Sequence, residues 1–444
     1  MEQIMHPVNQ SQKHQQRMGK IALALLLGGC ASLFLWAMIA TAAPVGRSAA
    51  PGYDPIVAEI ITWVNTPTLA YDLAGLTGER PVVVAGSLYT IATRNSYQTE
   101  AISMATRYVY EQFASFGLPV AYHDYTYNTY HWRNVIAEKS GVISPSRIYV
   151  LTAHVDNMPE GALAPGADDN GSGSVAVLTA ARLLAPYHFT HTLRFILFTG
   201  EEQGLRGSAA YAAECKARGE DVAGVINLDM IAYNSTYQPI IDLYAQTGMT
   251  GSIELTHLFS NVIGVYELDL IPHRYDVSSG FPIQNSDQWP FLQQGYPAFL
   301  AIEGLDDMTP YYHTVGDTLE TLDLAYYADY TRASIAAIVH LGGLLAGELA
   351  GAVHETDTGR PLEAVVEARA SHHARPFTTS STLTGAYTLS LPAGRYTVTV
   401  ARPLYYPAVF TDVSLVAGTV TTHEAMLTPW PRLYLPVVIQ AYGD

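Results

Sequence analysis

Short apolar runs alternate with alanine-rich segments over residues 55–345, and this alternation constrains the fold more than any other feature of the chain. The runs are rich in β-branched and aromatic residues, whereas the segments between them place apolar residues at helical spacing. Alternating strands and helices predict an α/β domain, with a mostly parallel mixed sheet flanked by helices. The expected strands are 147–153, 193–198, 223–230 and 297–302, and the expected helices are 172–184 and 208–218.

The character of the sequence changes near residue 346. Beyond it, polar and apolar residues alternate, as in 387–391 and 396–400, and the turn residues Pro392-Ala393-Gly394 predict a hairpin between these two runs. This pattern is typical of a small all-β sandwich. The predicted domains are an N-terminal segment over 1–50, the α/β domain over 51–346, the sandwich over 348–429 and a C-terminal tail over 430–444.

The N-terminal segment has the composition of an export signal. Basic residues precede an uncharged run from Ile21 to Ala43, and small residues at 40–42 fit a cleaved signal peptide. The run is also long enough for an uncleaved membrane anchor, and Cys30 leaves lipidation as a third alternative. In each case we expect the rest of the chain to be extracellular or on the cell surface, with membrane contact only through this segment.

The composition of the chain limits the kinds of partner that it can bind. A net charge of -17 argues against a nucleic-acid partner, because the phosphates of nucleic acid would be repelled. Apolar residues make up 49% of the chain and charged residues 14%, which predicts sizeable cores rather than disorder. The two cysteines are Cys30 and Cys215, so an exported domain without the N-terminal run has no disulfide framework.

Polar motifs follow several predicted strands, where open α/β sheets bind their ligands. His154 follows the strand that ends at Ala153, and Asp156 is placed to orient its second ring nitrogen. Glu201 and Glu202 follow the strand 193–198, and two adjacent carboxylates repel each other unless a cation lies nearby.

Three further motifs carry acids or a histidine. In the loop 166–173, Gly-Ala-Asp-Asp-Asn-Gly-Ser-Gly, a helix N-cap explains one polar residue but not the two adjacent acids. Asp229 ends another apolar run, and His313 precedes a polar turn. Each motif alone is ambiguous, but their convergence at strand ends predicts a common site.

Taken together, these motifs resemble those of the secreted bacterial leucyl-type zinc aminopeptidases. The wider family includes glutamate carboxypeptidases and glutaminyl cyclases, and the resemblance covers about 56–345. It implies the zinc exopeptidase fold and two zinc ions per chain. It also implies Glu201 as the general base and Asp156 as the partner of His154. The metal ligands that it implies are His154 and Asp229 for one zinc, Glu202 and His313 for the other, and Asp168 as the bridge.

The chain departs from this family at one motif. Relatives often carry Ser-Asp-His where this chain has Ser286-Asp287-Gln288, which puts specificity or rate in doubt. The oxyanion donor stays open among Tyr275, Tyr311 and Tyr312. The segment 348–429 resembles the carboxypeptidase regulatory-like modules, on turn motifs such as that at 385–387.

The resemblance favours an aminopeptidase that acts on peptides. A carboxypeptidase on the same metal core is the nearest alternative, and dependence on a free amine or a free carboxylate separates the two. A glutaminyl cyclase and a non-catalytic binding protein are disfavoured by the complete ligand set. Pyroglutamate formation tests the first of these, and zinc content tests the second.

Overall fold

A computed structural model describes residues 51–370 and 376–431 of the chain. The predictions for the export segment and Cys30, and most of the predicted C-terminal tail, therefore lie outside the described residues. Within those residues, no helix combines the length and the apolar character needed to cross a membrane.

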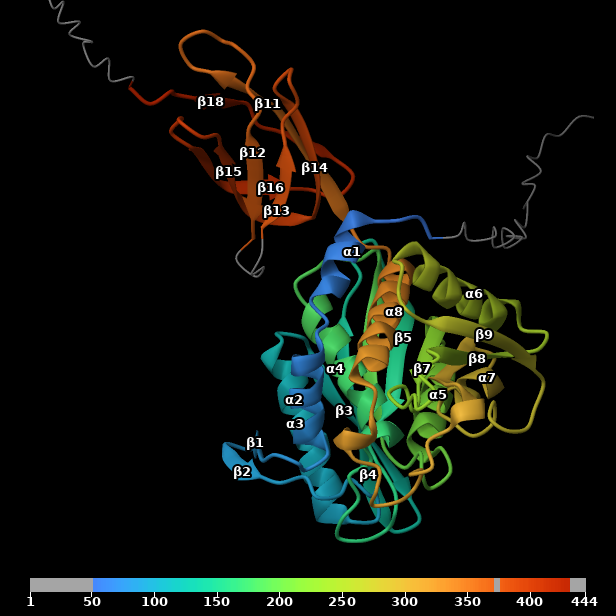
Figure 1. Ribbon diagram of the computed structural model, residues 1–444. Helices are drawn as coiled ribbons and strands as arrows, with labels where there is room; N and C mark the ends of the chain where they lie inside the picture. The colour runs from blue at the N-terminus through green and yellow to red at the C-terminus, as the bar shows by residue number, and fades with distance from the viewer. Residues whose placement is uncertain (1–50, 371–375, 432–444) are drawn as a thin grey trace, which may run out of the picture. The chain divides into compact units, whose positions relative to one another are not determined.

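The α/β domain is built on an eight-stranded mixed sheet with the strand order β3-β4-β6-β5-β7-β10-β8-β9 (Figure 1). The central strands β6, β5, β7 and β10 run parallel to one another, whereas β4 and β8 are antiparallel to the central strands that they flank. The predicted fold class is confirmed. The strands are β3 Val120–Tyr127, β4 Tyr130–Lys139, β5 Ser144–His154, β6 His191–Phe198, β7 Asp221–Leu228, β8 Ile240–Gln246, β9 Ile271–Val277 and β10 Ala298–Glu303; β1 Val82–Val84 and β2 Ser87–Tyr89 form a separate hairpin.

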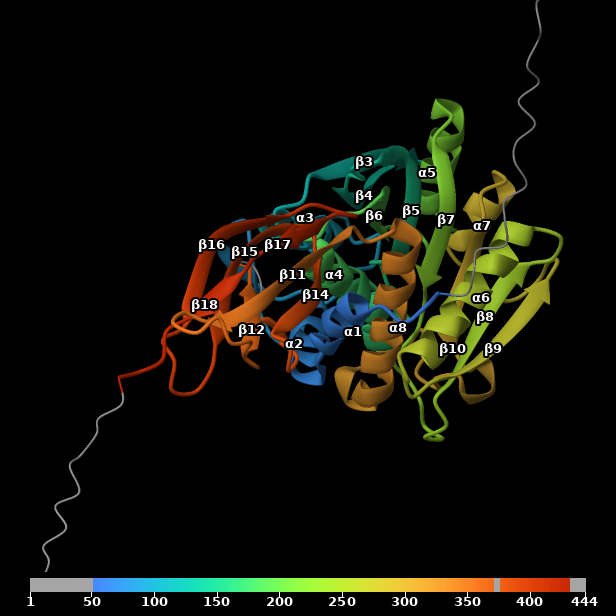
Figure 2. The ribbon, with the colours of Figure 1, turned by 90° about the horizontal axis from the view of Figure 1, so that it is seen from above.

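Helices cover both faces of this sheet (Figure 2). Successive residues of β5 show why, because Val150 faces one apolar core and Leu151 the other. A strand buried on both faces needs a helix layer on each side. The core on one face includes α1 Pro55–Thr62, α2 Thr66–Leu76, α3 Thr99–Ser115, α4 Gly173–Leu184, α6 Thr250–Val265 and α8 Leu324–Gly342; the other includes α5 Arg206–Arg218 and α7 Gln288–Gln293.

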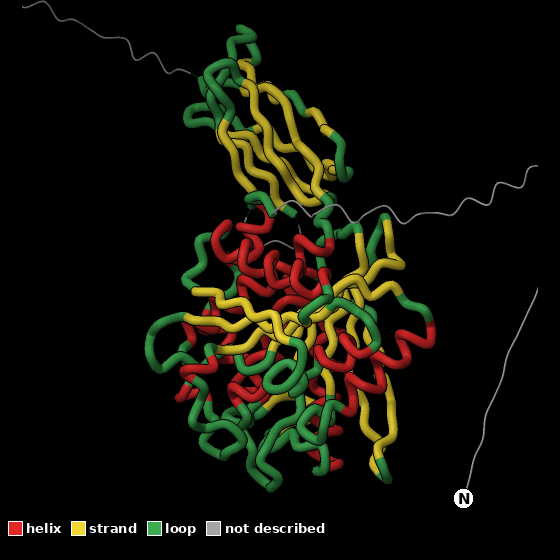
Figure 3. Tube along the Cα trace, turned by 90° about the vertical axis from the view of Figure 1, so that its right-hand side faces the viewer, coloured by secondary structure: helices red, strands yellow, loops and turns green. Residues whose placement is uncertain are grey.

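Loops gather at the edge of the sheet where the parallel strands end, at the bottom of the view in Figure 3. His154 is the last residue of β5, and Asp229 directly follows β7. His313 lies farther from a strand than the sequence suggested, in the long loop between β10 and α8. The topology nevertheless brings all these segments to one edge.

The C-terminal region consists of two small sheets around a separate apolar core. The predicted hairpin is wrong, because β14 pairs with β11 in one sheet and β15 pairs with β12 and β16 in the other. The turn at 392–394 therefore joins the two layers, and strands of both sheets turn apolar side chains to the shared core. The strands are β11 Ala346–Glu355, β12 Val365–Arg369, β13 Phe377–Ser380, β14 Ala386–Pro392, β15 Gly394–Ala401, β16 Ala408–Leu415, β17 Val420–Thr422 and β18 Ala425–Leu427.

Candidate metal centre

Two imidazoles and four carboxylates meet at the carboxyl edge of the sheet. His154 Nε2 lies 3.2 Å from Asp229 Oδ1, and His313 Nε2 lies 2.9 Å from Glu202 Oε2. Asp169 lies between them, with Oδ1 3.4 Å from His154 Nε2 and Oδ2 3.2 Å from His313 Nε2. The two oxygens of one carboxylate thus face the two imidazoles. We call His154, Asp169, Glu201, Glu202, Asp229 and His313 the edge cluster.

The prediction of Asp168 as the shared carboxylate is wrong by one residue. Asp169 has an extended backbone, with φ −103° and ψ 96°, inside the short turn η1 Ala167–Ser172. Side chains of neighbouring residues point to opposite sides of an extended backbone. Asp168 therefore points away from the edge cluster, where its Oδ1 accepts a hydrogen bond from the Ala232 N–H at 2.9 Å and its Oδ2 is buried without a hydrogen-bond partner.

The edge cluster concentrates negative charge in a buried place. Burial and the neighbouring Glu202 carboxylate raise the pKa of Asp169 to about 6. Burial alone would lower the pKa of His154, but the Glu201 and Asp229 carboxylates outweigh it and raise this pKa well above its ordinary value. Each group therefore disfavours the ionised form of its like-charged neighbours and favours a positive charge among them.

Asp156 orients His154 through its backbone rather than through its side chain. The Nδ1 atom of His154 lies 3.1 Å from the Asp156 carbonyl oxygen, but 3.8 Å from the carboxylate. The carboxylate instead accepts hydrogen bonds from the Ser96 hydroxyl at 3.1 Å and the Glu201 N–H at 3.3 Å. Asp156 thus links the end of β5 to the loop that carries the two glutamates.

Asp317 fixes the loop that carries Asp169. Its two carboxylate oxygens accept hydrogen bonds from the N–H groups of Asp168 and Asp169, at 2.8 and 2.9 Å. Gly166, with φ 53°, begins this loop, and a Cβ there would lie 2.4 Å from the Asp169 carbonyl oxygen. The glycine is required because the backbone approaches so closely. The motif at 312–318 therefore supplies His313 and also an anchor for Asp169.

The segment 93–96 is buried beside the edge cluster, but none of its residues was among the predicted site residues. The Ser96 hydroxyl accepts a hydrogen bond from the Gly200 N–H at 3.0 Å, in addition to its bond with Asp156. Burial lowers the pKa of the Arg94 guanidinium to about 10, against the raising effect of nearby Asp317, so Arg94 stays charged at neutral pH. Arg94, Asn95 and Ser96 are ordinary polar residue types, and no pattern in the sequence distinguishes them.

The motif at 286–288 supports Asp229. The Ser286 hydroxyl donates to Asp229 Oδ2 at 2.5 Å and accepts from the Asn227 amide at 2.7 Å. Gln288 is buried, accepts from the same Asn227 amide at 3.0 Å and donates to the Ile283 carbonyl oxygen. The glutamine that replaces the family's histidine is therefore part of a hydrogen-bonded network behind Asp229.

A hollow of about 420 Å³ opens over the edge cluster. Of the three tyrosines left open by the sequence, only Tyr312 lines it, and its ring stacks on His313 at 3.7 Å between centroids. Tyr275 stacks instead on Tyr244, and Tyr311 packs against Tyr233. The polar residues Gln284, Asn285 and Ser286 also line the hollow. Its apolar lining residues are Leu205, Met230, Phe281, Pro282, Leu300, Ile302 and Met308.

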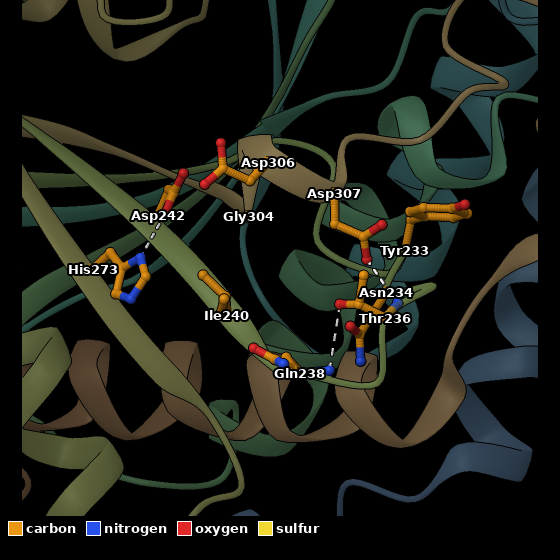
Figure 4. A pocket seen from close by; sticks show the side chains of 10 residues that line it. All are labelled: Tyr233, Asn234, Thr236, Gln238, Ile240, Asp242, His273, Gly304, Asp306 and Asp307. Carbon is orange, nitrogen blue, oxygen red and sulfur yellow. Dashed lines mark hydrogen bonds and ion pairs between the residues drawn. The ribbon is translucent and has the colours of Figure 1, made fainter.

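A second hollow, of about 270 Å³, holds none of the predicted site residues (Figure 4). Its Asp307 carboxylate already accepts hydrogen bonds from Ser235 and Thr236. His273 Nδ1 lies 3.7 Å from Asp242 Oδ1 on the neighbouring strand. The chemistry suggested by the sequence therefore belongs to the first hollow.

The edge cluster fits bound zinc. Its donors are imidazole nitrogens and carboxylate oxygens, which are zinc ligands in proteins. Glu202 Oε1 is buried without a hydrogen-bond partner, although such atoms are normally satisfied. Among the described residues, two groups place their ligand atoms close enough together to hold one metal ion. One is His154 with Glu201 and Asp229, and the other is His154 with Asp169 and Glu202.

An α/β sheet with imidazoles and carboxylates at its carboxyl edge defines a class of proteins that hold metal ions there. Residues 134–338 match Peptidase family M28. Residues 348–428 match the carboxypeptidase regulatory-like domain.

One curated relative is similar to this chain in sequence, and two solved structures are similar to it in fold. A probable leucine aminopeptidase of Trichophyton verrucosum is 31% identical over 226 residues, which are 48% of this chain and 59% of that protein. The chain thus spans less than two thirds of this relative. The LapA aminopeptidase of Legionella pneumophila shares the fold at 18% identity, with a TM-score of 0.56 over 67% of this chain and 76% of that one. LapB of the same organism is 22% identical, with a TM-score of 0.55 over 67% and 77%.

Proposed function

We propose that this protein is an exported dinuclear-zinc aminopeptidase that removes N-terminal residues from peptides. The edge cluster carries the proposal, because Asp169 offers one carboxylate oxygen to each of the two imidazoles. His154 and Asp229 would hold one zinc ion, Glu202 and His313 the other, and Asp169 both. When bound, such a pair makes water more acidic and polarises a peptide carbonyl. The proposal of export rests on the sequence of residues 1–50.

Glu201 has the position of a general base. Its carboxylate lies 3.9 Å from His154 Nε2 and lines the hollow, while its N–H is held by Asp156. In this role it accepts a proton from the attacking water and returns it to the leaving amine. The Tyr312 hydroxyl, in the same hollow, is the proposed donor to the oxyanion that forms on the carbonyl.

The charge of the hollow favours an aminopeptidase over a carboxypeptidase. Among the described residues that line it, none is an arginine or a lysine, whereas four carry carboxylates. A free C-terminal carboxylate would therefore have no guanidinium or ammonium group to bind there. A free α-ammonium group would find acids, and the apolar lining suits a side chain such as leucine.

Hydrolysis of a leucyl peptide by the full-length, zinc-loaded protein tests this proposal. We expect cleavage when the N-terminus is free and none when it is acetylated, with no effect of amidating the C-terminus. Glu201→Gln should retain zinc but lose turnover by about 10²–10⁴-fold, because the proton acceptor is gone. Equal cleavage of free and acetylated peptides would overturn the aminopeptidase assignment, and near-normal turnover in the variant would overturn the role of Glu201.

A further inference from the structure

Arg94 is fully buried, and each of its recorded side-chain hydrogen bonds goes to a backbone carbonyl oxygen. Nε donates to Val155 at 2.7 Å, and Nη2 donates to Gly166 at 2.8 Å. Nη1 donates to both Pro165 and Leu76, at 2.7 and 3.0 Å. A buried charge is costly unless it is hydrogen-bonded, and these carbonyl dipoles supply the bonds.

Apart from Leu76, the last residue of α2, the acceptors belong to the two segments that present groups of the edge cluster. Val155 lies between His154 and Asp156, while Pro165 and Gly166 begin the loop that carries Asp169. The Arg94 N–H extends the same link, because it donates to Asn157 Oδ1 at 3.0 Å and the Asn157 amide donates to the Ala164 carbonyl oxygen. Arg94 thus joins two chain segments that no β-sheet pairing connects.

We propose that Arg94 is a positioning residue that sets the distance between His154 and Asp169 and thereby the zinc affinity of the site. A guanidinium is a planar fork with fixed donor directions, so it satisfies these carbonyls only when the segments hold one relative placement. Losing it frees the Asp169 loop to move relative to the end of β5. The inference rests on the proposed zinc site, and it assigns Arg94 no contact with substrate or with the reacting atoms.

Arg94→Lys keeps the charge but replaces the fork with a point donor, and Arg332→Lys is its matched control. Arg332, on α8, also donates to a backbone carbonyl oxygen, that of Val64 at 2.7 Å, and contacts no residue of the edge cluster in its recorded bonds. Zinc affinity is measured by competition with a chromogenic chelator on the full-length protein. We expect about 10- to 100-fold weaker zinc binding in R94K and unchanged binding in R332K.

Hydrogen exchange of the zinc-free proteins gives a readout that needs neither metal nor activity. We expect R94K to speed amide exchange in peptides covering 155–171 and R332K to leave it unchanged. R94K with wild-type zinc affinity and wild-type exchange there would overturn the proposal. If the wild type binds no zinc, the proposed function fails, while the exchange result still decides the role of Arg94. Should R94K not fold, R94Q keeps part of the donor set, and wild-type exchange in R94Q would equally overturn the proposal.

Discussion

At the scale of single residues, the direction of one side chain decides which acid joins the edge cluster. The sequence identifies the acidic pair Asp168-Asp169, but both residues satisfy the same pattern. Their separation depends on the extended backbone at Asp169 and on Asp317, which holds both N–H groups. Neither property can be recognised from residue types. The sequence therefore predicts which loop supplies the acid, but not that the acid is Asp169.

Paired substitutions test this distinction. Asp169→Asn removes a negative oxygen from between the two imidazoles, so we expect the protein to lose bound zinc. Asp168→Asn keeps an oxygen acceptor for the Ala232 N–H and places an amide donor beside Glu303, so we expect zinc content to match the wild type. Metal analysis of the two purified variants after dialysis measures the difference. Zinc loss in Asp168→Asn with retention in Asp169→Asn would reverse the assignment.

The other members of the edge cluster were predicted from the sequence. His154, Glu202 and Asp229 each interrupt or end an apolar run, and the structure brings them together. Arg94 was not within reach, because its partners are backbone carbonyl oxygens, which leave no trace in the sequence of the acceptor residues. Sequence patterns find groups that perform chemistry more readily than groups that hold a backbone in place.

At the scale of elements, the strands that the sequence predicted are buried ones, although β8 is also buried and was not predicted. Strands β5, β6, β7 and β10 lie inside the sheet and carry nearly continuous apolar residues. The edge strand β9 escaped prediction because it is largely exposed and carries Pro272, His273 and Arg274. Edge strands commonly carry proline and charge, which weakens their pattern. The false hairpin at 392–394 arose because a tight turn does not specify which sheet the next strand enters.

The loop from Gly166 to Asp169 gives a prediction about backbone geometry. Gly166→Ala adds a Cβ 2.4 Å from the Asp169 carbonyl oxygen, whereas Gly248→Ala, also at positive φ, adds a Cβ with nothing within 4 Å. Both variants bear the cost of the left-handed conformation, but only the first is overpacked. We expect Gly166→Ala to lose about 1–3 kcal/mol more unfolding free energy than Gly248→Ala. Urea denaturation of both variants measures this, and equal losses would contradict the close approach.

At the scale of the whole molecule, the described residues form separate apolar cores. Two lie on opposite faces of the eight-stranded sheet, and the third lies between the small sheets of the sandwich. All residues of the edge cluster lie in the α/β domain, and none lies in the sandwich. A ligand that binds only one folded unit stabilises that unit by mass action.

Calorimetry of the full-length protein tests this independence. We expect two unfolding transitions, because a core of its own allows each domain to unfold cooperatively. Zinc at 100 times its dissociation constant should stabilise one transition by about 2.7 kcal/mol and leave the other unchanged. Excess chelator should reverse the shift, and Asp169→Asn should show none. A single transition that moves as a whole with zinc would contradict the separation of the cores.

If two cations bind as proposed, the position of Asp169 between His154 and His313 links their binding thermodynamically. Whatever cation engages one oxygen of this carboxylate also fixes the orientation of the other oxygen. The ordering cost of the shared side chain is therefore borne by the first ion and spared to the second, which favours cooperative filling, while repulsion between the two cations opposes it. By reciprocity, each ion changes the affinity for the other by the same factor. Under the proposed function, the two sites should therefore not fill independently as the metal concentration rises.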